Sequence, residues 1–139
     1  MVSEIDFQAA KEKAIRYIGI SKKTAYEVKR KLTTLKINSE IIGEVISYLT
    51  NLGYIDDEEY TILYIKQNIK FQKYSLYEIR QKLLSKGISN DLIDKHINLL
   101  YNIQYDQELK QKLLNTKLKG LDEVKAQAYL YRRGLKNYE

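Results

Sequence analysis

Cysteine and proline are both absent from this sequence of 139 residues. The lack of cysteine excludes a disulfide scaffold and a metal site built on thiolates, and it fits a reducing compartment. Because proline is absent, no helix is kinked or broken by a residue that lacks a backbone N–H. No apolar run approaches the ~20 residues that a membrane-spanning helix needs, and no secretory hydrophobic segment follows Met1. We therefore expect a cytoplasmic protein with no membrane partner.

Catalytic constellations are missing as well. His96 is the only histidine, and it aligns with Val45 in the internal repeat described below, so we expect a half-buried structural histidine. The sequence shows no nucleophile and base at a spacing known from catalytic motifs, and no glycine-rich loop that would bind phosphate. The carboxylates of residues 56–59 fit the first turn of a helix better than a magnesium site, because adjacent helical side chains diverge around the axis. We predict no enzyme, no catalytic residue, no metal and no cofactor.

Charge is unevenly distributed along the chain, whose net charge is +6. Residues 10–36 carry nine basic and two acidic side chains, and residues 66–86 carry six basic and one acidic. Residues 40–59 carry six acidic side chains and no basic one. Such stripes favour a polyanionic partner, although solvated helix faces would give the same composition.

The sequence is organised around a seam at residues 51–60. Gly53 follows a run with helical apolar spacing, which is typical of a helix C-terminus. Asp56 stands where the next helix needs an N-cap, and Asp57 follows in the acidic first turn. One helix therefore ends at the seam and another begins. The seam residues that we single out are Gly53, Tyr54, Asp56, Asp57 and Tyr60.

The stretch after the seam repeats the stretch before it. Residues 24–32 reappear as residues 75–83, with four of nine positions identical. Both copies open with a capping box, in which a Ser or Thr hydroxyl and a glutamate three residues later satisfy free amides. Residues 130–135 begin to repeat residues 83–88. Self-similarity at this period predicts an all-α, elongated and curved array of tandem three-helix repeats. We place the repeats at 1–54, 55–103 and 104–139, the last of them incomplete.

Glycines and apolar spacing predict the details of these repeats. Gly19 is expected to end the first helix, and Leu52 is expected to face inward together with the apolar residues before it. A last helix is expected to begin near Asn137. The offset of 51 residues that relates Thr24 to Ser75 would carry Tyr54 onto Tyr105.

Basic side chains recur on the second helix of each predicted repeat. Stacked repeats would place these helices in register and form a basic ridge that meets an acidic protein surface or DNA phosphates. The ridge comprises Lys22, Lys23, Lys29, Arg30, Arg80, Lys82, Lys86, Arg132 and Arg133. The thirteen tyrosines also permit stacking on single-stranded bases, but their helical spacing favours the edges of the core.

Several of these motifs occur together in one known family. The seam, residues 27–32 and the helix ends at 83–88 and 130–135 resemble, in order and spacing, the signatures of the RecX family of regulators of the RecA recombinase. The resemblance covers the chain from about Ala10 onward. One departure is the segment 21–24, where lysines stand in place of the arginines often found in the family, with a point charge instead of a planar fork.

The resemblance implies a curved, all-α molecule of three three-helix repeats. It implies a non-enzymatic negative regulator that lies in the groove of the RecA filament on DNA, inhibits ATP hydrolysis and strand exchange, and acts in DNA repair, recombination and the SOS response. The expected partner is the RecA filament, with single-stranded DNA as a second candidate, and the expected state is a monomer.

Two alternatives stay open. A direct DNA-binding protein would bind naked DNA tightly with a steep salt dependence, although no helix clusters Arg, Asn and Gln for base edges. A structural adaptor for another protein would have the same fold and no effect on a recombinase.

Overall fold

The structure, a computed structural model, describes residues 4–100 and 104–135. Within those ranges it contains eight helices and no strand, which confirms the predicted all-α fold. None of these helices is long and apolar enough to cross a membrane. The helices are α1 (Glu4–Ile20), α2 (Ala25–Thr34), α3 (Ser39–Asn51), α4 (Asp57–Phe71), α5 (Leu76–Ser85), α6 (Asn90–Leu100), α7 (Gln104–Asn115) and α8 (Glu123–Arg132).

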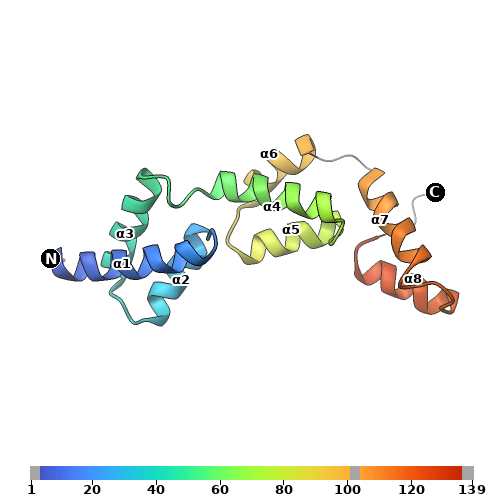
Figure 1. Ribbon diagram of the computed structural model, residues 1–139, viewed down its shortest axis with the longest axis horizontal. Coiled ribbons are helices and arrows are strands. Elements are labelled where there is room, and N and C mark those ends of the chain that lie inside the picture. Colours follow the sequence, from blue (N-terminus) through green and yellow to red (C-terminus); the bar gives the residue numbers. More distant parts are fainter. Residues whose placement is uncertain (1–3, 101–103, 136–139) are drawn as a thin grey trace.

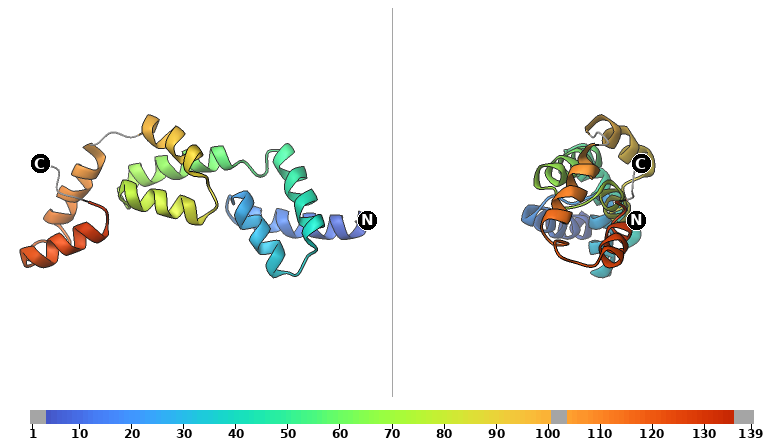
Figure 2. Two further views of the ribbon diagram at one scale, coloured as in Figure 1. Left: turned by 180° about the vertical axis from the view of Figure 1, so that it is seen from behind. Right: turned by 90° about the vertical axis from the view of Figure 1, so that its right-hand side faces the viewer.

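The helices form three groups that follow one another along the long axis (Figure 1). The first group contains α1, α2 and α3, the second α4, α5 and α6, and the third α7 and α8. Viewed along the axis, the groups lie one behind another (Figure 2). The molecule is therefore an elongated stack, as the repeat predicts.

Each group has its own hydrophobic cluster. Apolar residues of α1, α2 and α3 form the first cluster. Within it, Val28, Leu32, Val45 and Leu49 are fully buried. The second cluster lies between α4, α5 and α6 and the third between α7 and α8, with Ile69 of α4 packed against its edge. In a stack of this kind each unit buries little surface by itself, so its contacts with neighbouring units contribute a large share of stability.

Helix starts follow the predicted capping chemistry. Thr24 and Ser75 are N-caps of complete capping boxes: each hydroxyl accepts from the amide of the glutamate three residues on, at 3.1 Å and 3.2 Å, and each glutamate accepts from the N-cap amide at 3.0 Å. Asp56 caps α4 by accepting from the Glu59 amide at 3.0 Å. These local predictions are confirmed.

Two details of the prediction are wrong. Gly19 does not end the first helix, because α1 continues to Ile20 and its glycine keeps a helical backbone. Leu52 does not face inward: it is the C-cap residue of α3 and is 56% exposed, because the chain turns away from the core there. The predicted repeat end at residue 103 and the predicted helix near Asn137 lie outside the described residues.

Four helices end with the same turn, whose central residue has a left-handed backbone. In three of them that residue is glycine: Gly53, Gly87 and Gly134 have φ of 82°, 80° and 76°. At the end of α2 the position is held by Lys36 with φ of 61°, and the Ile37 amide still closes the turn onto the Leu32 carbonyl at 3.2 Å. A residue with a Cβ is strained in this conformation.

We therefore expect Lys36→Gly to raise the free energy of unfolding by about 0.5 to 1 kcal/mol, because relief of the strain exceeds the extra chain entropy of glycine. Urea unfolding followed by circular dichroism measures the change. Lys36→Ala is the control, since it removes the exposed lysine side chain but keeps the strain, and its stability should stay within about 0.5 kcal/mol of the parent. A loss of stability in Lys36→Gly would contradict the prediction.

Candidate partner interface

The first joint, as we call the contact between the first two groups, is built from the start of α2 and the end of α5. The Thr24 hydroxyl donates to the Lys86 carbonyl at 2.7 Å, and the Ala25 amide donates to the Asp57 carboxylate at 2.9 Å. The ring of Tyr26 packs over Gly87, where an added Cβ would lie 2.2 Å from the Tyr26 Cβ. The first turn of α2 and its N-cap therefore contact both α4 and the end of α5.

The second joint, between the second and third groups, repeats this chemistry. The Ser75 hydroxyl donates to the Arg133 carbonyl, and the Leu76 amide donates to the Asp106 carboxylate at 3.0 Å. Tyr77 packs over Gly134, whose added Cβ would lie 2.5 Å from the Tyr77 Cβ. The two joints therefore fix successive groups in the same way.

Asp57 has a role that the sequence did not reveal. It lies in the first turn of α4, as predicted, but its carboxylate accepts from an amide of α2, in the preceding group. Its counterpart is Asp106, at an offset of 49 residues, so the predicted pairing of Tyr54 with Tyr105 is wrong. Tyr54 is 53% exposed, whereas Tyr105 is buried.

Tyr105 strengthens the second joint. Its hydroxyl oxygen lies 2.7 Å from the Tyr74 carbonyl and 3.0 Å from the Asn68 carbonyl, so its single proton is shared between these two acceptors. Burial, assisted by the neighbouring Asp106 carboxylate, raises the pKa of Tyr105 to about 12. The phenol therefore stays a hydrogen-bond donor throughout the neutral range.

Two residues of the predicted basic ridge lie in the joints. The Arg133 guanidinium binds the Glu78 carboxylate at 2.8 Å, the Lys73 carbonyl at 2.8 Å and the Tyr129 hydroxyl at 3.2 Å. Lys86 lies 3.6 Å from the Glu27 carboxylate in the first joint. Arg133 thus uses its donors within the chain, whereas Lys86 makes a longer ion pair and lies over the rings of Tyr60 and Tyr64.

The other ridge residues differ in their partners. Lys22 pairs with Glu59 at 2.9 Å, and Arg80 pairs with Asp94. Lys23 donates to the Ser21 carbonyl at 3.1 Å. Lys29, Arg30 and Arg132 are exposed and form no ion pair with any described residue, and Lys82 lies over an aromatic ring. The assignment of these side chains to a partner surface stays a prediction.

His96 lies on α6, where it is 8% exposed, which is more buried than the half-buried position we expected. Its Nε2 lies 3.2 Å from Glu58 Oε1, and the Lys95 ammonium lies 3.1 Å from the same oxygen. The hydrogen bond and charge of Lys95, together with His96, lower the pKa of Glu58 against the opposing effect of burial. In the described ranges no group of three or more histidine, cysteine, aspartate or glutamate residues could hold a metal ion.

Family models match the first two groups of helices. The model described as RecX, first three-helix domain, matches residues 10–49, and the model described as RecX, second three-helix domain, matches residues 56–97. The two matched segments contain the residues of the first joint, which connects the first two groups, and the part of the seam that starts at residue 56.

Curated relatives show the same similarity. Regulatory protein RecX of Lactococcus lactis subsp. cremoris is 34% identical over 108 residues, which are 77% of this chain and 40% of that protein. Regulatory protein RecX of Caldanaerobacter subterraneus subsp. tengcongensis is 26% identical over 134 residues, which are 96% of this chain and 68% of that protein. The chain spans about 40% of the length of the Lactococcus relative.

Solved structures support the fold. The crystal structure of RecX from Lactobacillus salivarius has a TM-score of 0.77 at 22% identity and covers 99% of this chain and 91% of that one. A second crystal structure, of a regulatory protein RecX, has a TM-score of 0.83 at 22% identity and covers 95% of this chain and 69% of that one.

Proposed function

The chain belongs to the RecX family, and on this basis we propose that it is a negative regulator of the RecA recombinase. It docks as a monomer in the groove of the RecA filament on DNA, inhibits ATP hydrolysis and strand exchange, and limits filament growth during repair, recombination and the SOS response in the cytoplasm. The repeat boundaries at residues 54 and 103 are part of the proposal. The match of both three-helix domains to RecX carries it.

The shape of the molecule supports this proposal. A filament groove presents the same protein surface at regular intervals, and the chain presents three groups of helices along one axis (Figure 1). The joints hold these groups at fixed positions through side chains and backbone amides. We therefore expect a long interface with the filament that is made of several modest contacts. In such an interface the charged side chains determine the association rate and the register more than the affinity.

The exposed, unpaired part of the ridge supplies the charges for this interface. Lys29 and Arg30 are exposed neighbours in the sequence of α2 in the first group, and Arg132 is exposed at the end of α8 in the third. We expect charge reversal at these positions to leave both joints intact, because none of the three forms a joint hydrogen bond or ion pair with a described residue. They are therefore the positions at which function can be tested apart from folding.

Charge reversal of Lys29 and Arg30 to glutamate is expected to raise the concentration that half-inhibits RecA about 10-fold, or about 1.4 kcal/mol. The measurement is ATP hydrolysis on single-stranded DNA by RecA of the same organism. Reversal of Lys112 and Lys119, which are exposed on and after α7, makes the same charge change and should leave inhibition unaltered.

Unchanged inhibition by the folded Lys29 and Arg30 variant would remove these residues from the interface. No inhibition by the parent protein would contradict the regulatory proposal itself. A parent protein that does not inhibit RecA but binds naked DNA tightly, with a steep salt dependence, would be a direct DNA-binding protein. A parent protein that neither inhibits RecA nor binds DNA would be a structural adaptor for another protein.

A further inference from the structure

A groove of about 550 Å³ lies between α4 and α5 in the second group. We call it the α4–α5 groove; its chemistry is set by Tyr64, Phe71, Lys73, Tyr74, Lys82 and Lys86. The remaining lining residues are serine, glutamine and asparagine, and no carboxylate lines the groove. Three ammonium groups line this groove. Lys86 also lies 3.6 Å from the Glu27 carboxylate, whereas Lys73 and Lys82 have no acidic partner among the described residues, so the groove favours an anion.

Aromatic rings accompany these lysines. The Nζ atoms of Lys82 and Lys73 lie 4.4 Å and 5.2 Å from the centre of the Tyr74 ring. Lys86 Nζ lies 6.0 Å from the centre of the Tyr64 ring. Lys73 and Lys82 form no ion pair with a described residue, so their charge is available to a ligand at the groove.

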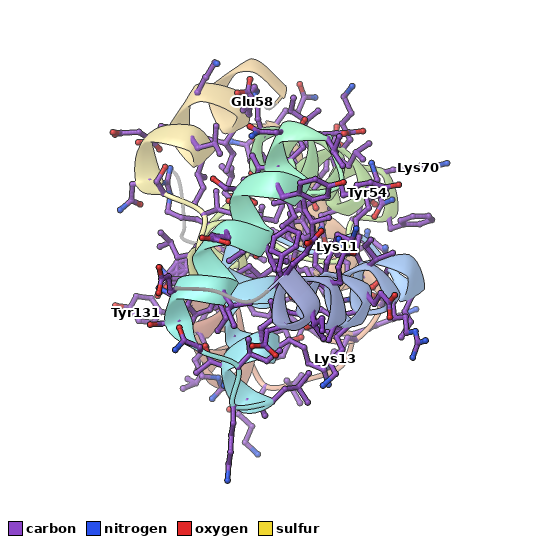
Figure 3. The ribbon with its side chains drawn as sticks, turned by 90° about the vertical axis from the view of Figure 1, so that its left-hand side faces the viewer. Lys11, Lys13, Tyr54, Glu58, Lys70 and Tyr131 are labelled. Atoms are coloured by element: carbon purple, nitrogen blue, oxygen red, sulfur yellow. The ribbon has the colours of Figure 1, made fainter. Side chains whose placement is uncertain are left out.

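Phe71, the last residue of α4, supplies an uncovered aromatic surface at the groove. It is 66% exposed and belongs to none of the three hydrophobic clusters. Its neighbour Lys70 points outward from the helices (Figure 3), with its Nζ 5.6 Å from the centre of the Phe71 ring. An exposed aromatic face between cations is the arrangement on which unpaired nucleobases stack.

The groove is held in place by the second joint. The Tyr105 hydroxyl shares its single proton between the backbone carbonyls of Tyr74 and Asn68, two residues that line the groove. The Arg133 guanidinium donates to the Lys73 carbonyl. The loop that carries Lys73 and Tyr74 is thereby fixed by the third group, and a ligand would not have to order it.

We propose that the α4–α5 groove binds single-stranded nucleic acid. Its backbone phosphates contact Lys73, Lys82 and Lys86, and a base stacks on Phe71. Single strands are favoured over duplexes because a paired base does not offer its face to a side chain. The proposal deepens the proposed function by giving the regulator its own contact with DNA, but its test contains no recombinase, so each can fail without the other.

Fluorescence anisotropy of a labelled oligothymidylate of about 12 nucleotides tests the groove. Phe71→Ala should weaken binding by about 5-fold or more, since stacking contributes roughly 1–3 kcal/mol per base. Lys82→Gln should weaken binding and lower the slope of log affinity against log salt by about 0.7. Circular dichroism establishes that both variants are folded.

Matched controls lie on the third group. Tyr131→Ala removes another exposed aromatic ring, 74% exposed, and Figure 3 places Tyr131 on the opposite side of the molecule from Lys70. Lys125→Gln removes an exposed lysine of α8. Both controls should bind as the parent does. Equal loss in Phe71→Ala and Tyr131→Ala, affinity for a hairpin duplex equal to that for the single strand, or no binding by the parent at low salt would overturn the proposal.

Discussion

Replacing Gly87 by alanine is expected to lower the free energy of unfolding by about 3 to 4 kcal/mol. The left-handed backbone at this position, with φ of 80°, costs an L-residue about 1–2 kcal/mol. The new Cβ would lie 2.2 Å from the Cβ and 2.6 Å from the Cγ of Tyr26. These atoms are close to the backbone of α2, so the clash is relieved only by moving the first group away from the second, at a further cost of about 1–3 kcal/mol.

Gly53 provides the matched control for this substitution. Its φ is 82°, yet an added Cβ would meet nothing within 4 Å. Gly53→Ala should therefore show the backbone cost alone, about 1–2 kcal/mol. Thermal or urea unfolding followed by circular dichroism gives both values, and their difference isolates the contact across the first joint. Equal losses in the free energy of unfolding of the two variants would show that the clash across the first joint costs no stability, which would contradict the prediction.

The second large effect is expected from Arg133→Ala, which should lower the free energy of unfolding by about 3 kcal/mol. Its side chain is 16% exposed and pairs with Glu78, which is 24% exposed. Removal would leave the Glu78 carboxylate and the Lys73 carbonyl without these donors, and uncompensated groups of this kind account for most of the cost of breaking a partly buried pair.

Arg132 is the control for Arg133 because it is adjacent, has the same chemistry and is exposed. Arg132→Ala should change stability by no more than about 0.5 kcal/mol. The comparison uses equilibrium urea unfolding of the two variants and the parent. Equal effects at the two positions would contradict the role of Arg133 in the second joint.

This pair also changes how a loss of regulation should be interpreted. A variant with both arginines replaced would lose an exposed charge and a joint contact together. The joint contact holds the Lys73 carbonyl and therefore the wall of the α4–α5 groove. Lys29, Arg30 and Arg132 are better positions for testing function, because their side chains form none of the hydrogen bonds or ion pairs that connect the groups among the described residues.

Lys36 occupies the turn after α2 that corresponds to the turns at Gly87 and Gly134. Its counterparts Gly87 and Gly134 each lie beneath a tyrosine of the preceding group, where only glycine fits. At the end of α2 a lysine holds the same turn with φ of 61°. The left-handed backbone favours glycine at every one of these turns, but packing requires glycine only at Gly87 and Gly134, inside the joints.

The sequence by itself determined the helices, their caps and their repetition. Thr24 with Glu27 and Ser75 with Glu78 satisfy amides within three residues, so nothing distant is needed to form the capping boxes. The all-α fold and the RecX family follow from such local signals and their spacing. Positions such as Val28 and Leu32 are likewise buried because helical periodicity places them on one face.

Only the tertiary structure decided which residues join one group to the next. Asp56 and Asp57 are adjacent and identical, yet Asp56 caps its own helix and Asp57 accepts from α2. Arg132 and Arg133 are equally alike, yet only Arg133 reaches Glu78. The direction in which each side chain points depends on how neighbouring helices dock, and docking is set by contacts between residues some 30 to 60 positions apart.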